Sequence, residues 1–405
     1  MDYSFTSSLN PNLFDEFSLQ HPLTSFFQST AWPKVKTEWE PIYTGVYQGT
    51  TLVAASLVLK RNLPLNLAIF YLPRGPLLDY DNVELVKFYF SSLKQLAKKE
   101  KVFLIRTDPN LIIDIKPLSS KINLQDHQDL PWLKNLKMAG LKHYGFNLGM
   151  YETYQPRFSA LIKYQDYDLK VSKGYRDSIK AQKRDVELVN LTYQDLPTFI
   201  KLLKETEKRQ NISLRDINYF EKLYQAYSDN IFLVATKLDL QQALIRQENN
   251  LRRLEKQISQ SNSETLKENL SYQAKIIGEN VSNFQKKIAA GEKEAFLSTL
   301  LAIKHGSTCE LLYAGADTSY GRYYASYLSY QSGIAWGQKK GCLTCNLGGI
   351  PGTLDDGLTT YKSFFNANMI EYIGEFDLPV KKITANLFRF AYPFLRKIRK
   401  YILRD

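Results

Sequence analysis

The chain is poor in cysteine and histidine, with three cysteines and four histidines among 405 residues. Three cysteines are too few for a disulfide framework. Cys342 and Cys345 form a Cys-x-x-Cys pair, but zinc would need two further thiol or imidazole ligands at short spacing, and none lies nearby in the sequence. We therefore expect all three cysteines to be structural and expect no metal site.

Long hydrophobic runs are also missing. No segment approaches the roughly 20 apolar residues that a helix needs to cross a bilayer, and Met1 to Asn10 has neither the basic start nor the apolar stretch of a signal peptide. Hydrophobic residues make up 44% of the chain and charged residues 23%, which is close to the average of globular proteins. We expect a folded cytoplasmic protein of two to three domains rather than a multi-span membrane protein or a disordered chain.

Positive charge is what the chain has in excess, with a formal net charge of +12. Such an excess favours an anionic partner, either nucleic acid or a phospholipid surface. Residues 381–405 hold eight basic side chains against one acidic side chain, interleaved with aromatic and aliphatic residues. That mixture predicts a basic amphipathic helix that lies in a membrane interface and binds anionic phospholipid. The alternative is a helix packed on the neighbouring domain with a solvated basic edge.

A helical arm is predicted over residues 239–291, where polar and charged side chains dominate and proline is absent. Its second half has an apolar seam at alternating spacings of 4 and 3 residues, formed by Leu270, Ala274, Ile277, Val281, Phe284 and Ile288. Residues 259–263 have turn and helix-capping chemistry, so the two halves are expected to fold into an antiparallel coiled coil about 35 Å long. Apolar runs at 231–235 and 309–314 flank the arm and are expected to be neighbouring strands, which makes the arm an insertion within a domain.

The rest of the chain alternates between helical and strand-like patterns, which is typical of a mixed α/β fold. Strands are expected at 52–58, 68–71, 103–107, 158–161 and 344–347, and helices at 83–100, 174–183 and 200–209. A transition at about 142–157 divides the chain into similar halves. We expect a first domain at 1–150, a second domain formed by 151–238 and 292–380, the arm at 239–291 and the basic helix at 381–405.

Ten short phrases outside the arm occur in an order that resembles one known family. They are Gln28-Ser-Thr-Ala-Trp32, Tyr71-Leu-Pro-Arg-Gly-Pro76, Thr107-Asp-Pro109, Gln155-Pro-Arg157, Tyr175-Arg-Asp-Ser-Ile-Lys180, Thr206-Glu-Lys-Arg209, Tyr313-Ala-Gly315, Leu347-Gly-Gly-Ile350, Tyr361-Lys-Ser-Phe-Phe365 and Glu371-Tyr-Ile-Gly-Glu-Phe376. Over nearly the whole chain they resemble the FemABX family of peptidoglycan aminoacyltransferases. The arm and the length are most similar to the MurM and MurN type of streptococci.

The resemblance implies two acetyltransferase-like (GNAT-like) domains with the coiled-coil arm inserted in the second. It also implies transfer of an amino acid, with Ala or Ser expected, from aminoacyl-tRNA to lipid II, which would place the protein at the inner face of the cell membrane. The acceptor would be the stem-peptide lysine amine or the first branch residue, and neither a metal nor a cofactor would be required. Because tRNA and the lipid diphosphate are both anionic, the basic composition agrees with this interpretation. The oligomeric state stays open.

The resemblance also assigns candidate residues for binding the acceptor. Lys36, Trp39, Arg215 and Tyr219 match its acceptor-binding positions, and two cations with two aromatics suit a diphosphate and a sugar. Arg209 is a competing candidate for the phosphate. Each of these residues has a structural alternative, either a surface ion pair or a place in the core.

Two further residues are candidates for the chemistry. Lys362 matches a cation beside the transfer site, where it would stabilise the oxyanion or the leaving ribose oxygen. Asp108 follows a strand and precedes a proline, and it is a candidate proton acceptor whose alternative role is to hydrogen-bond the turn backbone. A basic run that could meet tRNA phosphates, or be a solvated helix face, comprises Lys173, Arg176, Lys180, Lys183 and Arg184.

Three other functions stay as alternatives at this point. The same chemistry could act on a UDP-linked precursor instead of lipid II. The protein could be a non-enzymatic coiled-coil protein that binds RNA or membranes, although the ordered phrases outside the arm argue against that. An acyl-CoA-dependent acyltransferase is disfavoured because nothing resembles the phosphate-binding loop Arg/Gln-x-x-Gly-x-Gly.

Overall fold

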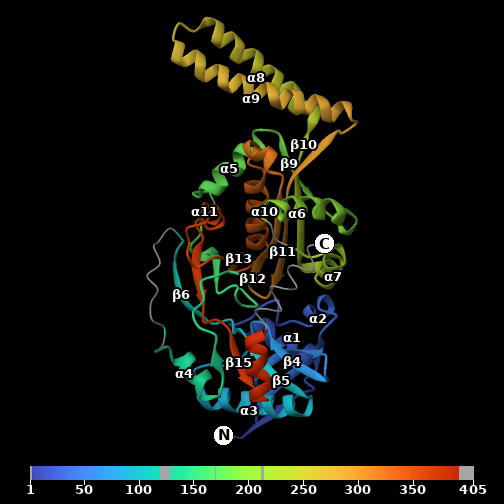
Figure 1. The fold of residues 1–405 in the computed structure, drawn as a ribbon, viewed down its shortest axis with the longest axis vertical. Coiled ribbons are helices and arrows are strands. Elements are labelled where there is room, and N and C mark those ends of the chain that lie inside the picture. Colours follow the sequence, from blue (N-terminus) through green and yellow to red (C-terminus); the bar gives the residue numbers. More distant parts are fainter. Residues whose placement is uncertain (1, 119–126, 128, 169, 211–213, 392–405) are drawn as a thin grey trace.

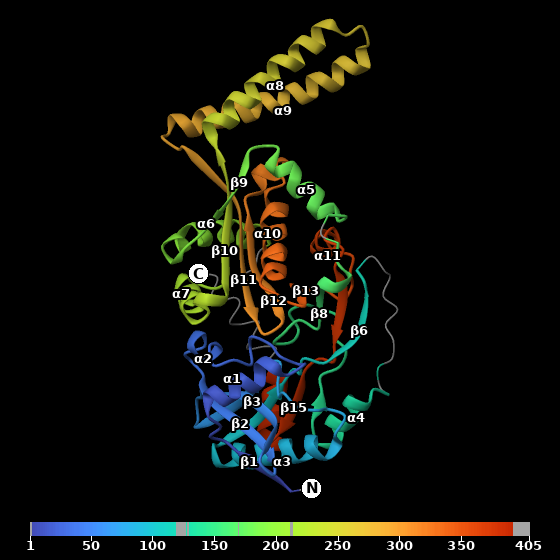
Figure 2. The same cartoon turned by 180° about the vertical axis from the view of Figure 1, so that it is seen from behind.

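The computed structural model describes residues 2–118, 127, 129–168, 170–210 and 214–391. Two mixed β-sheets lie one above the other along the long axis of the molecule, and a helical hairpin projects from the far end of the second (Figures 1 and 2). Within the described residues, no helix is both long and apolar enough to cross a membrane.

The first sheet has the strand order β1-β2-β3-β4-β5-β15-β7. Helix α3 covers one face of it, because its buried residues Val86, Tyr89 and Leu93 pack on Val58 and Phe70 of the sheet. The bounds are β1 (Tyr3–Thr6), β2 (Glu40–Gln48), β3 (Thr51–Leu63), β4 (Leu67–Leu72), β5 (Val102–Thr107), β7 (Lys142–His143) and β15 (Phe376–Pro379), with α1 (Pro11–Gln20), α2 (Trp32–Val35), α3 (Val83–Lys99) and α4 (Pro131–Met138).

The second sheet has the order β6-β14-β8-β13-β12-β11-β10-β9. Its strands are β6 (Ile112–Pro117), β8 (Phe158–Lys163), β9 (Val186–Asn190), β10 (Ile231–Asp239), β11 (Glu294–His305), β12 (Thr308–Ala316), β13 (Thr344–Ile350) and β14 (Asn368–Tyr372), and its helices are α5 (Lys173–Gln182), α6 (Leu196–Gln210), α7 (Ile217–Ala226), α10 (Ala325–Lys339) and α11 (Gly357–Ser363). Successive residues of a strand face opposite sides, so Val234 packs in the cluster with α10 while Leu233 packs in the cluster with α6 and α7.

One hydrophobic cluster joins the two halves of the molecule. It contains Phe14 and Trp32 from the first half and Phe199, Phe220 and Leu233 from the second. Helix α2 therefore packs against α7, as both views show (Figures 1 and 2). A shared core of this kind holds the side chains at the α2–α7 junction in fixed positions.

The expected domain boundaries need a correction, because two strands cross them. β6 lies within residues 1–150 but pairs with β14 in the second sheet, and β15 lies within 292–380 but pairs with β5 in the first. Phe376 opposite Thr107 is one pair of this register. Each sheet is thus completed by a strand from the other half of the chain, which no break in composition could reveal.

The arm forms as expected from α8 (Leu240–Gln260) and α9 (Glu264–Ala289). The side chains of Asp239 and Ser263 cap the two helices by accepting backbone N–H groups. The two flanking apolar runs are not neighbours, however. β11 lies between β10 and β12 and pairs with both, so the arm connects β10 to β11 and the expectation of a direct β10–β12 pair was wrong.

The expected basic C-terminal helix is described only in part. Residues 382–391 are helical, and 392–405 lie outside the described residues. Phe388 packs 5.3 Å from Phe103 between ring centroids, and Arg389 Nε lies 3.5 Å from Asp377 Oδ2. Ile383 is 78% exposed. One side of this segment thus packs on the first sheet while apolar side chains remain on its surface.

Candidate functional site

Three of the expected acceptor-binding residues meet at the α2–α7 junction. Lys36 ends α2 and its Nζ lies 5.6 Å from the ring centroid of Trp32 and 5.4 Å from that of Tyr219. The guanidinium of Arg215 also lies 5.4 Å from the centroid of the Tyr219 ring. Tyr313 of β12 donates a hydrogen bond of 3.2 Å to the Tyr219 hydroxyl. Both cations therefore lie beside the same aromatic ring.

The electrostatics of this junction favour an anion. Burial, and next the neighbouring charge of Arg215, lower the pKa of Lys36 to about 8. Within the part of the chain that the structure describes, neither cation forms an ion pair with a carboxylate. A doubly charged group placed between Lys36 and Arg215 would restore the ammonium charge and relieve the repulsion between the two cations.

Trp39 continues this surface toward Asp108. Its ring lies 6.1 Å from that of Tyr71, and the guanidinium of Arg61 lies 5.4 Å from the Trp39 ring. The Tyr71 hydroxyl donates to Asp108 Oδ2 at 2.8 Å, and the backbone N–H of Arg74 donates to Asp108 Oδ1 at 2.7 Å. Burial raises the pKa of Asp108. Because both carboxylate oxygens already accept protein hydrogen bonds, the contacts favour a turn-holding role for Asp108.

A second group of polar residues lies where β12 and β13 separate. These parallel strands pair only from Thr308–Thr344 to Glu310–Asn346 and then diverge. The Asn346 side chain hydrogen-bonds Glu310 and accepts the backbone N–H of Gly348 at 2.9 Å. Two strands that splay apart in this way leave backbone groups unpaired at the gap, where a ligand can bind them.

Lys362 lies at this strand gap. Its Nζ donates to the Gly349 carbonyl at 2.8 Å, and a side chain added at Gly348 would meet it at 3.4 Å. Gly348 has φ of +87°, a conformation that favours glycine. Lys362 is 4% exposed, and burial lowers its pKa to about 7, which the charge of Asp356 opposes. A lysine with this pKa exchanges a proton near neutrality.

Glu310 and Arg74 are residues that the sequence interpretation did not place in the site. Burial raises the pKa of Glu310 to about 8, while Arg74 and the Asn346 side chain oppose the shift. The guanidinium of Arg74 lies 3.9 Å from the Tyr372 ring and donates to the Pro156 carbonyl at 3.0 Å. Arg74 thus connects the Asp108 turn to the strand gap. A single glutamate in a strand gives no local signal, whereas the phrase Pro73–Pro76 did mark the Arg74 turn.

Arg209, the competing candidate for the phosphate, does not lie beside Lys36 and Tyr219. Arg209, at the end of α6, donates to the Ala316 carbonyl at the end of β12, 3.3 Å away, and is exposed. Arg215 is therefore the cation that the structure places beside Lys36 and Tyr219, and Arg209 anchors α6 to the sheet.

The expected basic run lies on and just after α5, at the end of the second domain that carries the arm (Figures 1 and 2). Lys173 and Lys180 both pair with the buried Asp177, at 3.4 and 2.7 Å, and the Arg184 guanidinium lies 4.8 Å from the Tyr324 ring. Part of this charge is therefore neutralised within the helix. The other members, Arg176 and Lys183, are exposed.

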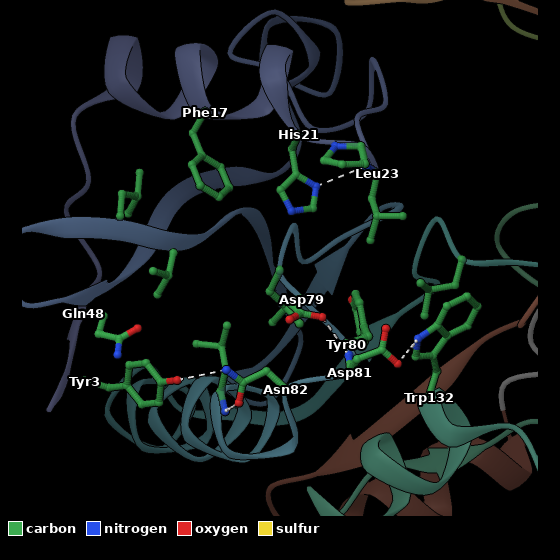
Figure 3. Close-up of a pocket in the computed structure, with 16 residues that line it drawn as sticks. Tyr3, Phe17, His21, Leu23, Gln48, Asp79, Tyr80, Asp81, Asn82 and Trp132 are labelled. Carbon is green, nitrogen blue, oxygen red and sulfur yellow. Dashed lines mark hydrogen bonds between the residues drawn. The ribbon is translucent and has the colours of Figure 1, made fainter. Parts of the chain in front are cut away.

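A separate cavity of about 580 Å³ lies in the first domain, between α1, the β2–β3 hairpin and α3. Figure 3 shows His21, Asp79 and Trp132 around it. None of the expected site residues lines it. Among the residues that the structure describes, no group of three or more His, Cys, Asp or Glu side chains could hold a metal ion, and the three cysteines are buried and free.

Comparison with known proteins identifies the family. The model of the FemAB family matches residues 9–393. The chain belongs to the FemAB family. Two relatives from Staphylococcus aureus, strains bovine RF122 / ET3-1 and MSSA476, are each named lipid II:glycine glycyltransferase and are 28% identical over 424 residues, covering 96% of this chain and 96% of their own. The family resemblance expected from the sequence is confirmed, and the narrower MurM and MurN type stays a prediction.

A solved structure shares the fold of this FemAB chain over nearly its whole length. The chain superposes on the crystal structure of FemX with a TM-score of 0.73 and 25% identity, over 96% of this chain and 99% of that chain. A tandem GNAT protein from the clavulanic acid biosynthesis pathway matches with a TM-score of 0.47 and 8% identity, over 94% and 99% of the two chains. The expected mixed α/β fold, built on two sheets, is confirmed.

Proposed function

We propose that this FemAB protein is an aminoacyltransferase of peptidoglycan cross-bridge synthesis that transfers an amino acid from aminoacyl-tRNA to an amine of lipid II. The observation that carries the proposal is a pair of connected sites. One has two cations at the α2–α7 junction with no carboxylate ion-pair partner among the described residues, and the other has a buried lysine at the strand gap. Arg74 connects the two sites, because its backbone N–H bonds Asp108, which also accepts from the Tyr71 hydroxyl beside Trp39, and its charge acts on Glu310 at the gap. The names of the relatives support the acceptor.

The junction binds the acceptor in this proposal. Lys36 and Arg215 hold the diphosphate from two sides, since a guanidinium matches phosphate oxygens in a bidentate way and an ammonium adds charge. Trp39 and Tyr219 supply flat surfaces with polar edges for the sugar. The stem peptide then runs past Asp108 and Arg74 toward the gap between β12 and β13.

The transfer takes place at the gap between β12 and β13. The acceptor amine attacks the ester carbonyl of the aminoacyl group, so that a C–N bond forms and the C–O bond to the ribose breaks. Glu310 takes the proton that the amine loses, because an approaching ammonium favours the ionised carboxylate. Lys362 stabilises the oxyanion of the tetrahedral intermediate and gives a proton to the departing ribose oxygen.

The donor side of the proposal rests on the basic surface. Arg176 and Lys183, with the partly neutralised Lys173, Lys180 and Arg184, would contact tRNA phosphates near the base of the arm. Ala or Ser is proposed as the transferred residue, to the stem lysine or to the first branch residue. The basic C-terminal segment would hold the protein at the inner face of the membrane by binding anionic phospholipid.

A transfer assay tests this function directly. Purified protein is incubated with lysine-containing lipid II and tRNA charged with radiolabelled Ala, Ser or Gly, with and without RNase. Label on lipid II that disappears with RNase is the expected result. With lipid II below saturation, Lys36→Ala should reduce this label while folding and tRNA binding persist. Label that resists RNase, or that appears only with acyl-CoA, would refute a tRNA donor. If label reaches only a UDP-linked precursor, that precursor is the acceptor instead of lipid II.

A further inference from the structure

A surface groove adjoins the acceptor end of the proposed site. It lies between α6 and the start of α7, has a volume of about 590 Å³ and includes Arg215 in its lining. Ile200, Leu203 and Ile217 supply apolar lining, and Ile217 is 37% exposed. Figures 1 and 2 show α6 and α7 at the side of the second domain, with α2 beside α7. We call this feature the α6–α7 groove.

The acidic side chains of the α6–α7 groove have hydrogen-bond partners within the protein, whereas two of its lysines have no carboxylate partner among the described residues. Its three carboxylates all accept hydrogen bonds from the protein: Glu205 from Lys208, Glu207 from the Leu214 backbone and Asp216 from the Tyr219 backbone. Lys201 and Lys204, by contrast, have no carboxylate partner in the described part of the chain. They lie three residues apart on the exposed side of α6 and therefore share one face. The groove thus offers unpaired cations beside an apolar lining.

We propose that the α6–α7 groove binds the first isoprene units of a prenyl chain whose diphosphate lies at Arg215 and Lys36. The proposal rests on the proposed function, because it takes the diphosphate of the acceptor to bind at the α2–α7 junction. Arg215 belongs both to that junction and to the groove. Its position reproduces the chemical order of a prenyl diphosphate, in which the charged group is followed directly by an apolar chain.

A nucleotide would use the same surface poorly. The group beyond the diphosphate of a UDP-linked precursor is a ribose and a base. Their hydrogen-bonding atoms would lose water against Ile200 and Ile217 and would compete for carboxylates that already accept protein hydrogen bonds. A prenyl chain instead covers apolar side chains that otherwise face water. Lys201 and Lys204 would meet the anionic headgroups of the leaflet from which the chain emerges. The groove therefore selects a lipid-linked acceptor.

The test compares acceptors that differ only in the length of the prenyl chain. Transfer is measured in detergent with undecaprenyl-linked lipid II, with an analogue that carries a single five-carbon prenyl group, and with the UDP-linked precursor. We expect kcat/KM to be at least about tenfold higher for the long chain than for the short one, because a few buried methylenes give that factor. Ile217→Asn should bring this ratio toward one, and Ile245→Asn, on the exposed surface of the arm, should leave it unchanged.

A charge variant provides an independent readout. Lys201→Glu combined with Lys204→Glu should raise KM for lipid II in vesicles with anionic lipid, and should have no such effect in neutral detergent. Equal kcat/KM for long and short chains, an unchanged ratio in folded Ile217→Asn, or faster transfer to the UDP-linked precursor would overturn the groove assignment. Absence of transfer to all three acceptors would refute the proposed function itself.

Discussion

Removal of the buried charge of Lys362 is the perturbation that tests the transfer chemistry most directly. Its Nζ has one protein acceptor, the Gly349 carbonyl, and lies in the gap between β12 and β13. Replacing Lys362 by methionine keeps an unbranched apolar stem of similar size but removes the cation. Loss of one positioned oxyanion donor lowers kcat by about 10²–10³. We expect a loss of that size, with little change in KM for the acceptor.

The same substitution should not destabilise the fold, which separates a catalytic from a structural role. A shift of the Lys362 pKa from 10.5 to about 7 corresponds to roughly 5 kcal/mol against the buried cation. The unpaired Gly349 carbonyl would cost about 1–3 kcal/mol in return. Between pH 7 and 10.5 the unfolded chain binds more protons at this position than the folded chain. Stability of the wild type therefore rises with pH across that window, and the rise should be smaller in Lys362→Met.

The assay combines single-turnover transfer from pH 6 to 9 with thermal unfolding. The wild-type rate should fall as Lys362 loses its proton above about pH 7, and this descending limb should be absent from Lys362→Met. Lys340→Met, at an exposed position after α10, is the matched control and should behave as wild type. A Lys362→Met protein that retains more than a tenth of the wild-type rate would refute the assigned role. A large fall in Tm would indicate a structural lysine.

Further predictions concern the acceptor site, the proton acceptor and the arm. Lys36→Ala should raise KM for lipid II at least about tenfold with kcat nearly unchanged, because a charged hydrogen bond to phosphate contributes about 1.5–3 kcal/mol; an unchanged KM in steady-state kinetics would count against it. Glu310→Gln should abolish the rise of the transfer rate on the acid side of its pH optimum, and calorimetry should show a more stable protein at pH 8, since burial raises the pKa of Glu310 and the native state disfavours its ionisation. Phe284→Ala should lower the free energy of unfolding by about 3–5 kcal/mol in denaturant titrations, because this side chain is 2% exposed at the base of the arm, and unaltered stability would contradict that packing.

Features with local causes could be predicted from the sequence. The arm follows from a repeat of apolar residues three and four positions apart and from two capping side chains, Asp239 and Ser263, which each accept a backbone N–H three residues further along the chain. β11 was missed because its position in the sheet depends on pairing with two other strands. The exchange of β6 and β15 between the sheets depends on partners more than 250 residues apart. No local pattern encodes such a partner.

The candidate site divides in the same way. Lys36, Arg215 and Tyr219 were named through the family resemblance, and the structure brings them together. Glu310 could not be named, because its raised pKa arises from burial in the packed structure, against the opposing contacts of Arg74 and Asn346. Asp108 was named for its place before a proline, but its role depends on Tyr71 and on the Arg74 backbone.

The exchange of strands between the two halves bears on how the protein is made. In the folded protein, Arg106 is 3% exposed and pairs with Glu375 at 3.2 Å and with Asp377 at 2.9 Å. During synthesis the first half leaves the ribosome long before these carboxylates exist, so a first sheet that packed without β15 would bury an uncompensated guanidinium. β5 also presents an open edge until β15 arrives. The nascent chain must therefore keep its first domain unfinished until almost the last residues are translated, and that interval is when it most needs protection from aggregation.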